Sequence, residues 1–186
     1  MYTRELFEDK FRSGERLKYV FFWGHTPAAD GSITSACFSQ WWDCRFTVSG
    51  VEYHTAEQYM MAQKAVLFGD DEVRREIMSA GHPKQFKELG RKISGFKQEI
   101  WDKSCRDIVI AGNIAKFSQN KELGDYLMTT GERVLVEASP RDRIWGIGMG
   151  KSNPDCENPT LWKGTNYLGF CLMEVRDILT GGRNDR

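Results

Sequence analysis

The stretch VEYHTAEQYMMAQKAVLF, residues 51–68, predicts a helix that is apolar almost all the way round. At about 100° per residue, Glu57 and Lys64 fall on the same face of such a helix. A helix of this kind is usually buried, and an unpaired charge inside a protein costs several kcal/mol. Glu57 and Lys64 therefore either form a structural ion-pair network or belong to a functional site.

The residues around this helix predict where it begins. Thr55 and Gln58 match the capping-box pattern, in which each side chain bonds a free N–H at the helix start. This places Glu57 in the first turn, where the positive end of the helix stabilises a carboxylate. The preceding segment FTVSGVEYH, residues 46–54, alternates around Ser49 and Gly50 and predicts a β-hairpin.

Elsewhere the hydrophobic spacing predicts mainly helices. Strands are expected at residues 20–23 and 133–139, and helices at 70–80, 83–90, 96–119, 121–130 and from about 166 onward. The longest predicted helix carries Ile100, Ile108 and Ile114 among polar residues, which indicates an amphipathic helix. The last predicted helix is expected to face the core with Leu168, Leu172, Val175 and Leu179. The predicted fold class is α+β, a mainly helical single domain with a few short strands.

Composition narrows the choice of function. The 186 residues suit one domain, and 26 basic residues balance 26 acidic ones, so no bulk charge points to nucleic acid or membrane. A local basic groove remains open. No segment reaches the roughly 18 apolar residues of a membrane-spanning helix, and the charged N-terminus lacks a signal-peptide core.

The cysteines and histidines point to a reduced, metal-free protein. Five scattered cysteines without a CxxC pair are typical of reduced thiols, so a cytoplasmic location is expected. Three scattered histidines offer no cluster of metal ligands. We therefore expect neither a disulfide framework nor a protein-built metal site.

The loop EASPRDRIWGIGMGKSNPD, residues 137–155, is the richest in groups that could act on a ligand. It follows a predicted strand and carries Asp142 and Trp145, and its glycines, Gly146 and Gly148, would let backbone approach a ligand closely. It lacks the following helix that a dinucleotide-binding fingerprint requires. The alternative is an ordinary turn anchored by an aromatic side chain.

Other candidates for ligand binding each have a structural alternative. They are Phe22, Trp23, His54, Arg91 with Lys92, and Asn166. The aromatic side chains either stack on a base or fill the core, and Asn166 either caps the last helix or bonds a ligand. His54 either shuttles a proton or ends the hairpin, and the two basic residues after a helix suit either a phosphate or solvent.

Several segments, in order, resemble the NADAR family, which is also called YbiA-like. They are FFWGHTP, FSQWW, YHTAEQYMMAQKAVLFGD, LGR, AKFSQN, TGERVLVEASPRDRIWGIGMG and WKGTNYLGFCLMEVR. The resemblance covers residues 18–180. Residues 1–17 would form an N-terminal extension, expected to be helical, and residues 181–186 a flexible tail.

The resemblance implies an N-glycosidase. We expect it to use no cofactor and to have no membrane partner. Its implied substrates are phosphoribosyl-amino-pyrimidine intermediates of riboflavin synthesis, or ADP-ribose attached to guanine in nucleic acid. From their charge and their position in loops, Arg91, Lys92, Arg141 and Arg143 are candidates to bind the phosphates. The alternative, from a different functional class, is a non-catalytic module that senses ADP-ribose or a nucleotide.

The resemblance also implies roles for individual residues. Glu57 matches the family's glutamate and would stabilise an oxocarbenium-like transition state or activate water. Lys64 would bind phosphate, keep Glu57 ionised, or attack the opened sugar as an amine. Asp142 matches the acid of the D-x-x-W-G pattern and would orient ribose hydroxyls or a water, while Trp145 would stack on base or sugar. Where the YbiA branch has an acid, this chain has Ile147, which weakens any transfer of substrate identity.

Overall fold

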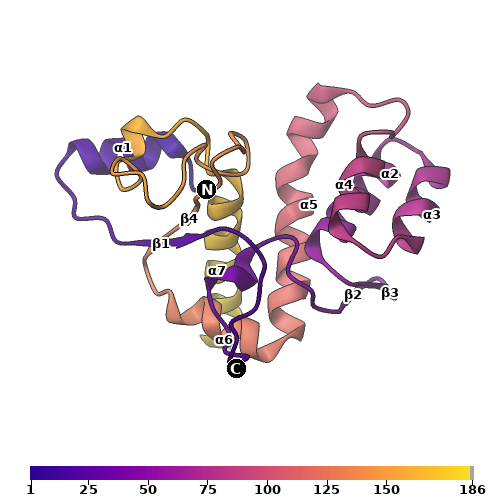
Figure 1. Ribbon diagram of the computed structural model, residues 1–186, viewed down its shortest axis with the longest axis horizontal. Helices are drawn as coiled ribbons and strands as arrows, with labels where there is room; N and C mark the ends of the chain where they lie inside the picture. Colours follow the sequence, from indigo (N-terminus) through magenta and orange to yellow (C-terminus); the bar gives the residue numbers. More distant parts are fainter. Residues whose placement is uncertain (185–186) are drawn as a thin grey trace. The chain divides into compact units, whose positions relative to one another are not determined.

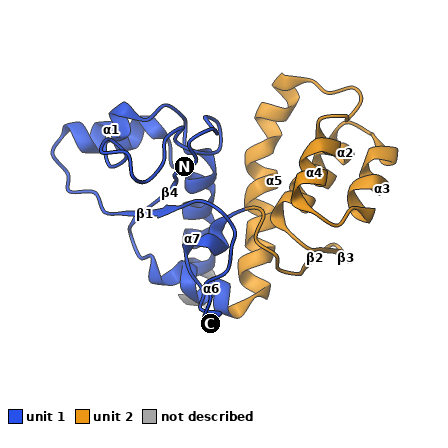
Figure 2. Ribbon diagram, in the orientation of Figure 1, with its two compact units in different colours: residues 1–39, 122–186 blue, residues 40–121 orange. Residues whose placement is uncertain are grey.

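The computed structural model describes residues 1–184, with side chains for residues 1–181 (Figure 1). The chain folds into two compact units (Figure 2). Unit 1 comprises residues 1–39 and 122–186, and unit 2 comprises residues 40–121. The helices are α1 (Arg4–Arg12), α2 (Ala56–Leu67), α3 (Asp71–Ser79), α4 (Pro83–Gly90), α5 (Gln98–Gln119), α6 (Lys121–Thr129) and α7 (Tyr167–Asn184). The strands are β1 (Tyr19–Phe22), β2 (Phe46–Val48), β3 (Val51–Tyr53) and β4 (Val134–Glu137), and two short 3₁₀ turns are η1 (Ser35–Phe38) and η2 (Pro159–Leu161). The predicted α+β class is confirmed.

Unit 2 begins with the predicted hairpin. β2 and β3 pair antiparallel, with Phe46 opposite Tyr53, and the turn residues Ser49 and Gly50 have φ angles of 50° and 80°. Two positive φ angles in a two-residue turn match the right-handed twist of the flanking strands, and glycine accepts such an angle at little cost. The hairpin leads directly into α2, which packs against α3, α4 and α5.

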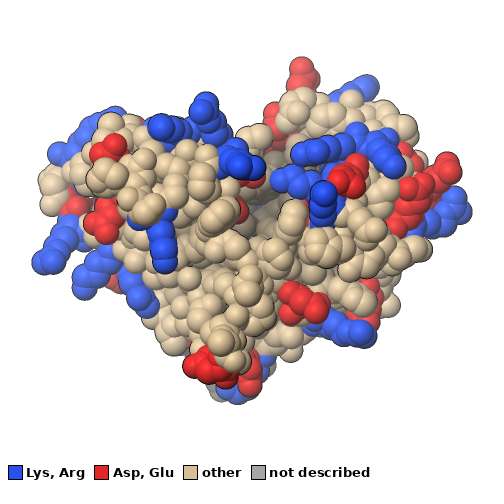
Figure 3. Space-filling view, viewed as in Figure 1, with Lys and Arg blue, Asp and Glu red and all other residues tan. Residues whose placement is uncertain are grey.

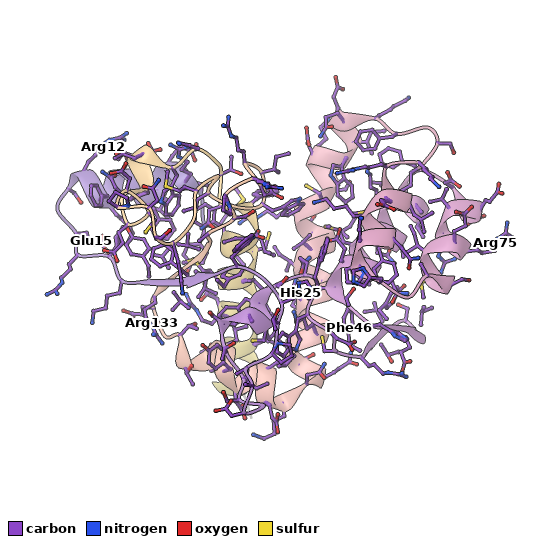
Figure 4. All side chains as sticks on the ribbon, viewed as in Figure 1. Arg12, Glu15, His25, Phe46, Arg75 and Arg133 are labelled. Carbon is purple, nitrogen blue, oxygen red and sulfur yellow. The ribbon has the colours of Figure 1, made fainter. Side chains whose placement is uncertain are left out.

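Aromatic rings join the hairpin to the helices of unit 2. The Tyr59 ring on α2 lies 5.1 Å from the Tyr53 ring and 6.2 Å from the ring of Phe46, which is labelled in Figure 4. Tyr59 also contacts α5 at Gly112, where an added Cβ would lie 2.5 Å from the ring. The absence of a side chain at Gly112 therefore lets α5 approach α2 closely.

The longest helix, α5, is amphipathic as predicted, but its isoleucines do not mark its buried face. Ile100 is 40% exposed, whereas Cys105 is 5% exposed and Val109 is 1% exposed. The buried side continues through Gly112 and Asn113. The contact of Gly112 with the Tyr59 ring places this side of α5 against α2.

Unit 1 is built on a parallel pair of strands from distant parts of the chain. Tyr19 of β1 pairs with Val134 of β4, and Phe22 pairs with Glu137. Helix α7 packs against β4. Consecutive apolar residues of β4 are buried, as is typical of a strand covered on both faces. Of the residues of α7 predicted to face inward, Leu168, Leu172 and Val175 are each at most 1% exposed. The fourth, Leu179, is only half-buried.

The N-terminal helix α1 is packed against the rest of unit 1. Phe7 is 4% exposed, and its ring stacks on that of Phe170 at 5.4 Å with an interplanar angle of 10°. The Arg4 side chain donates a hydrogen bond to the Gly164 carbonyl at 3.4 Å. At the other end of the chain, α7 extends to Asn184, while the last two residues of the expected flexible tail lie outside the described residues.

Candidate active site

The start of α2 is fixed by hydrogen bonds close to those predicted. Thr55 is the N-cap, and its hydroxyl accepts a bond from the Gln58 N–H at 3.1 Å. The Gln58 carboxamide oxygen accepts a hydrogen bond from the N–H of His54 at 2.8 Å. In a capping box it would instead accept from the N–H of the N-cap residue, Thr55. The helix therefore begins where the sequence predicted, with Glu57 in its first turn.

Glu57 is buried and is also held from outside its own helix. Glu57 is only 5% exposed, and its backbone N–H donates a hydrogen bond to the Gln40 carbonyl at 2.9 Å. The Gln40 side-chain oxygen accepts from Asn113 on α5 at 2.9 Å, and Asn113 donates also to the Val109 carbonyl at 2.8 Å. Gln40 thus links α5 to the first turn of α2, at the end where the helix dipole favours a carboxylate.

Lys64 lies further along α2 among aromatic rings. Its Nζ donates to the Gly90 carbonyl at 2.9 Å and lies 4.3 Å from the ring centre of Phe96 and 5.3 Å from that of Trp101. Burial lowers the pKa of Lys64 below its ordinary value, and the charge of Glu57 acts in the opposite direction. The two residues singled out in the sequence therefore influence each other electrostatically.

Two further predicted residues of unit 2 lie at the ends of its elements. The side chain of His54, just after β3, is 52% exposed and has its Nε2 3.8 Å from an oxygen of Glu52. Arg91 is exposed and is the C-cap of α4, directly after the Gly90 carbonyl that Lys64 bonds. Arg91 is thus adjacent in sequence to the partner of Lys64, while its phosphate-binding role stays a prediction.

In unit 1, Asp142 organises the loop that follows β4. One oxygen of its carboxylate accepts bonds from the N–H groups of Ile144 at 2.9 Å and Trp145 at 2.8 Å. Its carbonyl accepts from Gly148 at 2.9 Å. The half-buried Trp145 ring lies 5.3 Å from that of Tyr167 at the start of α7. Asp142 and Trp145 thus form the turn anchored by an aromatic side chain that the sequence left as an alternative. Their roles in substrate binding stay predictions.

The glycines of this loop are explained by contacts within the chain. A Cβ at Gly146 would lie 2.9 Å from the carbonyl oxygen of Glu137, and Gly148 has a φ of 67° that other residues rarely adopt. Both positions therefore require glycine whether or not a ligand approaches them. Close approach to a ligand at these positions is still a prediction.

Asn166 joins the start of α7 to β4. It is fully buried with a φ of 56°. Its side-chain oxygen accepts from the Glu137 N–H at 2.9 Å, and its amide nitrogen donates to the Leu135 carbonyl at 2.9 Å. These bonds give Asn166 a structural role that differs from a simple side-chain helix cap.

The aromatic candidates on and after β1 differ in exposure. Phe22 is 2% exposed and packs edge-on against Phe38, with ring centres 5.6 Å apart. Trp23 is 66% exposed. Phe22 therefore follows the core alternative left open by the sequence, whereas Trp23 presents its ring to solvent.

The predicted residues fall into two groups, one in each unit. Unit 2 contains His54, Glu57, Lys64 and Arg91, and unit 1 contains Phe22, Trp23, Asp142, Trp145, Gly146, Gly148 and Asn166. Figure 3 shows Lys and Arg side chains interspersed with Asp and Glu on the face in view, in keeping with the neutral net charge. Glu57 and Lys64, the two charged residues singled out on α2, both lie within unit 2, and their catalytic roles stay predictions.

The model of the NADAR domain matches residues 21–180. The chain belongs to the NADAR family. N-glycosidase R617 of Acanthamoeba polyphaga mimivirus is 44% identical over 168 residues, which cover 88% of this chain and 97% of that relative. N-glycosidase YbiA of Escherichia coli (strain K12) is 33% identical over 132 residues, covering 71% and 74%.

A solved NADAR relative supports the same assignment. The NMR structure of the E. coli protein YbiA superposes with a TM-score of 0.72 at 28% identity, covering 91% of this chain and 89% of that chain. The resemblance predicted from the sequence motifs is therefore confirmed. Within the described residues, none of the helices of this NADAR chain is long and apolar enough to span a bilayer.

The sequence did not point to several residues that lie around Glu57 and Lys64 in this NADAR chain. They are Gln40 and Asn113 beside Glu57, and Gly90, Phe96 and Trp101 beside Lys64. Asn113 gave no signal in the sequence, because the isoleucines of α5 do not mark the face that is buried. The aromatic neighbours of Lys64 gave no signal either, since they follow it by 32 and 37 residues.

Proposed function

We propose that the chain is an N-glycosidase that hydrolyses the ribose C1′–N bond of a phosphorylated ribosyl compound. The similarity to N-glycosidase R617 supports this reaction class, because it extends over 97% of that relative at 44% identity. Two substrates fit the proposal. One is a phosphoribosyl-amino-pyrimidine intermediate of riboflavin synthesis, and the other is ADP-ribose attached to guanine in nucleic acid.

The observation that carries the proposal is the environment of Glu57. It is a buried carboxylate, 5% exposed, in the first turn of α2, where the helix dipole favours its charged form. As the C1′–N bond breaks, positive charge develops on the ribose, and a fixed carboxylate in a region of little water stabilises that charge strongly. Burial and position thus suit Glu57 to transition-state stabilisation.

Glu57 can also act as the general base. In the balanced reaction, the oxygen of a water forms a bond to C1′ while the C1′–N bond breaks. Glu57 accepts a proton from that water. The leaving nitrogen keeps the bonding electron pair, and Glu57 then passes the proton to it, directly or through solvent. The products are a free ribosyl sugar and the released base, and Glu57 returns to its charged form.

We propose supporting roles for Lys64 and Asp142. Lys64 as an ammonium binds a phosphate and supports the charge of Glu57. In the alternative route Lys64 as a free amine attacks C1′ of the opened sugar, the base leaves with a proton as an imine forms, and water hydrolyses the imine to release the sugar and the amine. The lowering of its pKa by burial favours the amine, and the charge of Glu57 favours the ammonium. Asp142 orients ribose hydroxyls or a water, and Trp145 stacks on base or sugar.

The proposal is tested by turnover of wild type and Glu57→Gln on both substrates, with the released base or sugar followed by mass. Glutamine keeps the size of the side chain but removes its charge and its basicity, so we expect kcat to fall by at least about 100-fold. Glu52→Gln is the matched control, because Glu52 is 52% exposed and pairs with Arg45 at 3.0 Å on the hairpin. This control should retain wild-type turnover.

Two outcomes would contradict the proposal, and a third would make it more specific. Equal turnover by wild type and Glu57→Gln would remove Glu57 from the mechanism. Tight binding of ADP-ribose without turnover by folded wild type would favour the sensor module. Hydrolysis of one substrate alone would identify the substrate class.

A further inference from the structure

We propose that the Gly90 carbonyl and the rings of Phe96 and Trp101 form a box that fixes the Lys64 amino group and sets the pH at which it loses its proton. We call these three residues the Lys64 box. Phe96 and Trp101 are then positioning residues that act through Lys64. The catalytic consequence rests on the proposed function, whereas the box itself does not.

Three groups of unit 2 lie around the Lys64 amino group. An ammonium has three N–H donors. One of them is directed to the Gly90 carbonyl, with Nζ to oxygen at 2.9 Å. The ring centres of Phe96 and Trp101 lie 4.3 and 5.3 Å from Nζ, both within the roughly 6 Å over which a ring face attracts a cation.

Separate elements of unit 2 supply the box, so its geometry is determined by the packing of those elements. Gly90 is the last residue of α4, and a Cβ there would lie 2.1 Å from the sulfur of Met61 on α2. The missing side chain lets the end of α4 approach α2 and present its carbonyl to Lys64. Phe96 precedes α5 and packs against Phe68, the C-cap of α2, with ring centres 5.2 Å apart.

The electrostatic effects on Lys64 oppose one another. Burial lowers its pKa, and Glu57 on the same helix raises it. The ring faces also favour the charged form, because their negative potential attracts an ammonium. The charged side chains that flank the box on α4, the loop after it and α5 are exposed: Lys87, Glu88, Arg91, Lys92, Lys97, Glu99 and Asp102.

The sign of the expected change follows. If a ring is replaced by an aliphatic side chain, the site stays apolar but the ammonium loses its attraction to the ring face. The pKa of Lys64 then falls. If Lys64 works as an ammonium, the alkaline limb of the kcat/KM profile moves to lower pH. If it works as a free amine, the acidic limb moves to lower pH instead.

The experiment is an NMR titration of the Lys64 side chain in full-length protein labelled with ¹³C and ¹⁵N lysine. The signal is assigned by its loss in Lys64→Arg. We expect the titration midpoint to fall by about 0.5 to 1 pH unit in Phe96→Leu and in Trp101→Leu. Phe96→Tyr, which keeps a ring face, should retain the wild-type midpoint.

Phe11→Leu is the matched control, since Phe11 on α1 is 38% exposed and Phe96 is 40% exposed. It should leave the Lys64 midpoint unchanged. If a leucine variant fails to fold, pentafluorophenylalanine at position 96 keeps the size of the ring but reverses the charge of its face, and the midpoint should again fall.

The outcomes separate the box from the proposed function. An unchanged midpoint in the folded leucine or fluorinated variants overturns the box. A lower midpoint with no movement of either limb of the pH–rate profile supports the box and contradicts the proposed catalytic role of Lys64. A lower midpoint with a moved limb supports both, and the limb that moves identifies the working form of Lys64.

Discussion

Asp142 combines a structural role with its proposed role in catalysis. Its carboxylate oxygen accepts bonds from the N–H groups of Ile144 and Trp145, which turns the loop after β4. The side-chain oxygen of asparagine can accept the same two bonds, since it has the same position and two lone pairs. The charge of Asp142 can therefore be removed without removing the turn.

This separation gives a prediction for two variants. Asp142→Asn should keep its free energy of unfolding within about 0.5 kcal/mol of wild type, whereas Asp142→Ala should lose about 1–2 kcal/mol because both N–H groups lose their acceptor. If the charge orients ribose or water, both variants should lose turnover by at least about 10-fold. Denaturant unfolding and turnover assays measure the two effects. Full activity in Asp142→Asn would show that the only role of Asp142 is to stabilise the turn.

Between α2 and α5, the close contact depends on one residue without a side chain. The ring of Tyr59 lies 6.2 and 5.1 Å from the ring centres of Phe46 and Tyr53, and a Cβ at Gly112 would lie 2.5 Å from it. The ring cannot move aside easily because these aromatic neighbours surround it. The intrinsic preference of α5 for alanine over glycine, about 1 kcal/mol, is therefore opposed by packing.

We predict that Gly112→Ala lowers the free energy of unfolding by about 1–2 kcal/mol, because overpacking exceeds the gain in helix propensity. Gly81→Ala is the control, since a Cβ there would meet nothing within 4 Å. That variant should be unchanged or up to about 1 kcal/mol more stable. Chemical denaturation measures both. Equal stability of the two variants would mean that the Tyr59 contact does not limit the approach of α5.

Across the whole molecule, unit 1 joins segments from both ends of the chain. β1 pairs with β4, and α1 packs on α7 through Phe7 and Phe170. The family match begins at residue 21, so α1 lies outside it and yet buries an aromatic side chain in this unit. The N-terminal helix therefore contributes to the stability of unit 1.

The corresponding prediction is that Phe7→Ala lowers the free energy of unfolding by about 3 kcal/mol, the cost of removing a buried ring and leaving a cavity. Phe11→Ala serves as the control on the same helix, because Phe11 is 38% exposed and Phe7 only 4%. Phe11→Ala should change stability by about 0.5 kcal/mol or less. Thermal and denaturant unfolding compare the two. Similar losses in both variants would argue against a specific role for the stacked ring.

Local signals in the sequence were enough to predict most elements of the fold. Ser49 and Gly50 predicted the hairpin turn, Thr55 the start of α2, and Pro83 with Gly90 the two ends of α4. These features form hydrogen bonds or fix backbone angles within a few consecutive residues. Motifs distributed along the chain also identified the family, and helical periodicity placed Glu57 and Lys64 on one face.

Other features were decided only by tertiary packing. The sequence did not predict that β1 pairs with β4 in parallel, that α5 buries Gly112 and Asn113 rather than Ile100, or that rings surround Lys64. Each depends on contacts between residues far apart in the chain, and these contacts follow from how volumes fill the space between elements. Periodicity within one segment indicates which faces are apolar, but the side chains of the neighbouring elements determine which of them is buried.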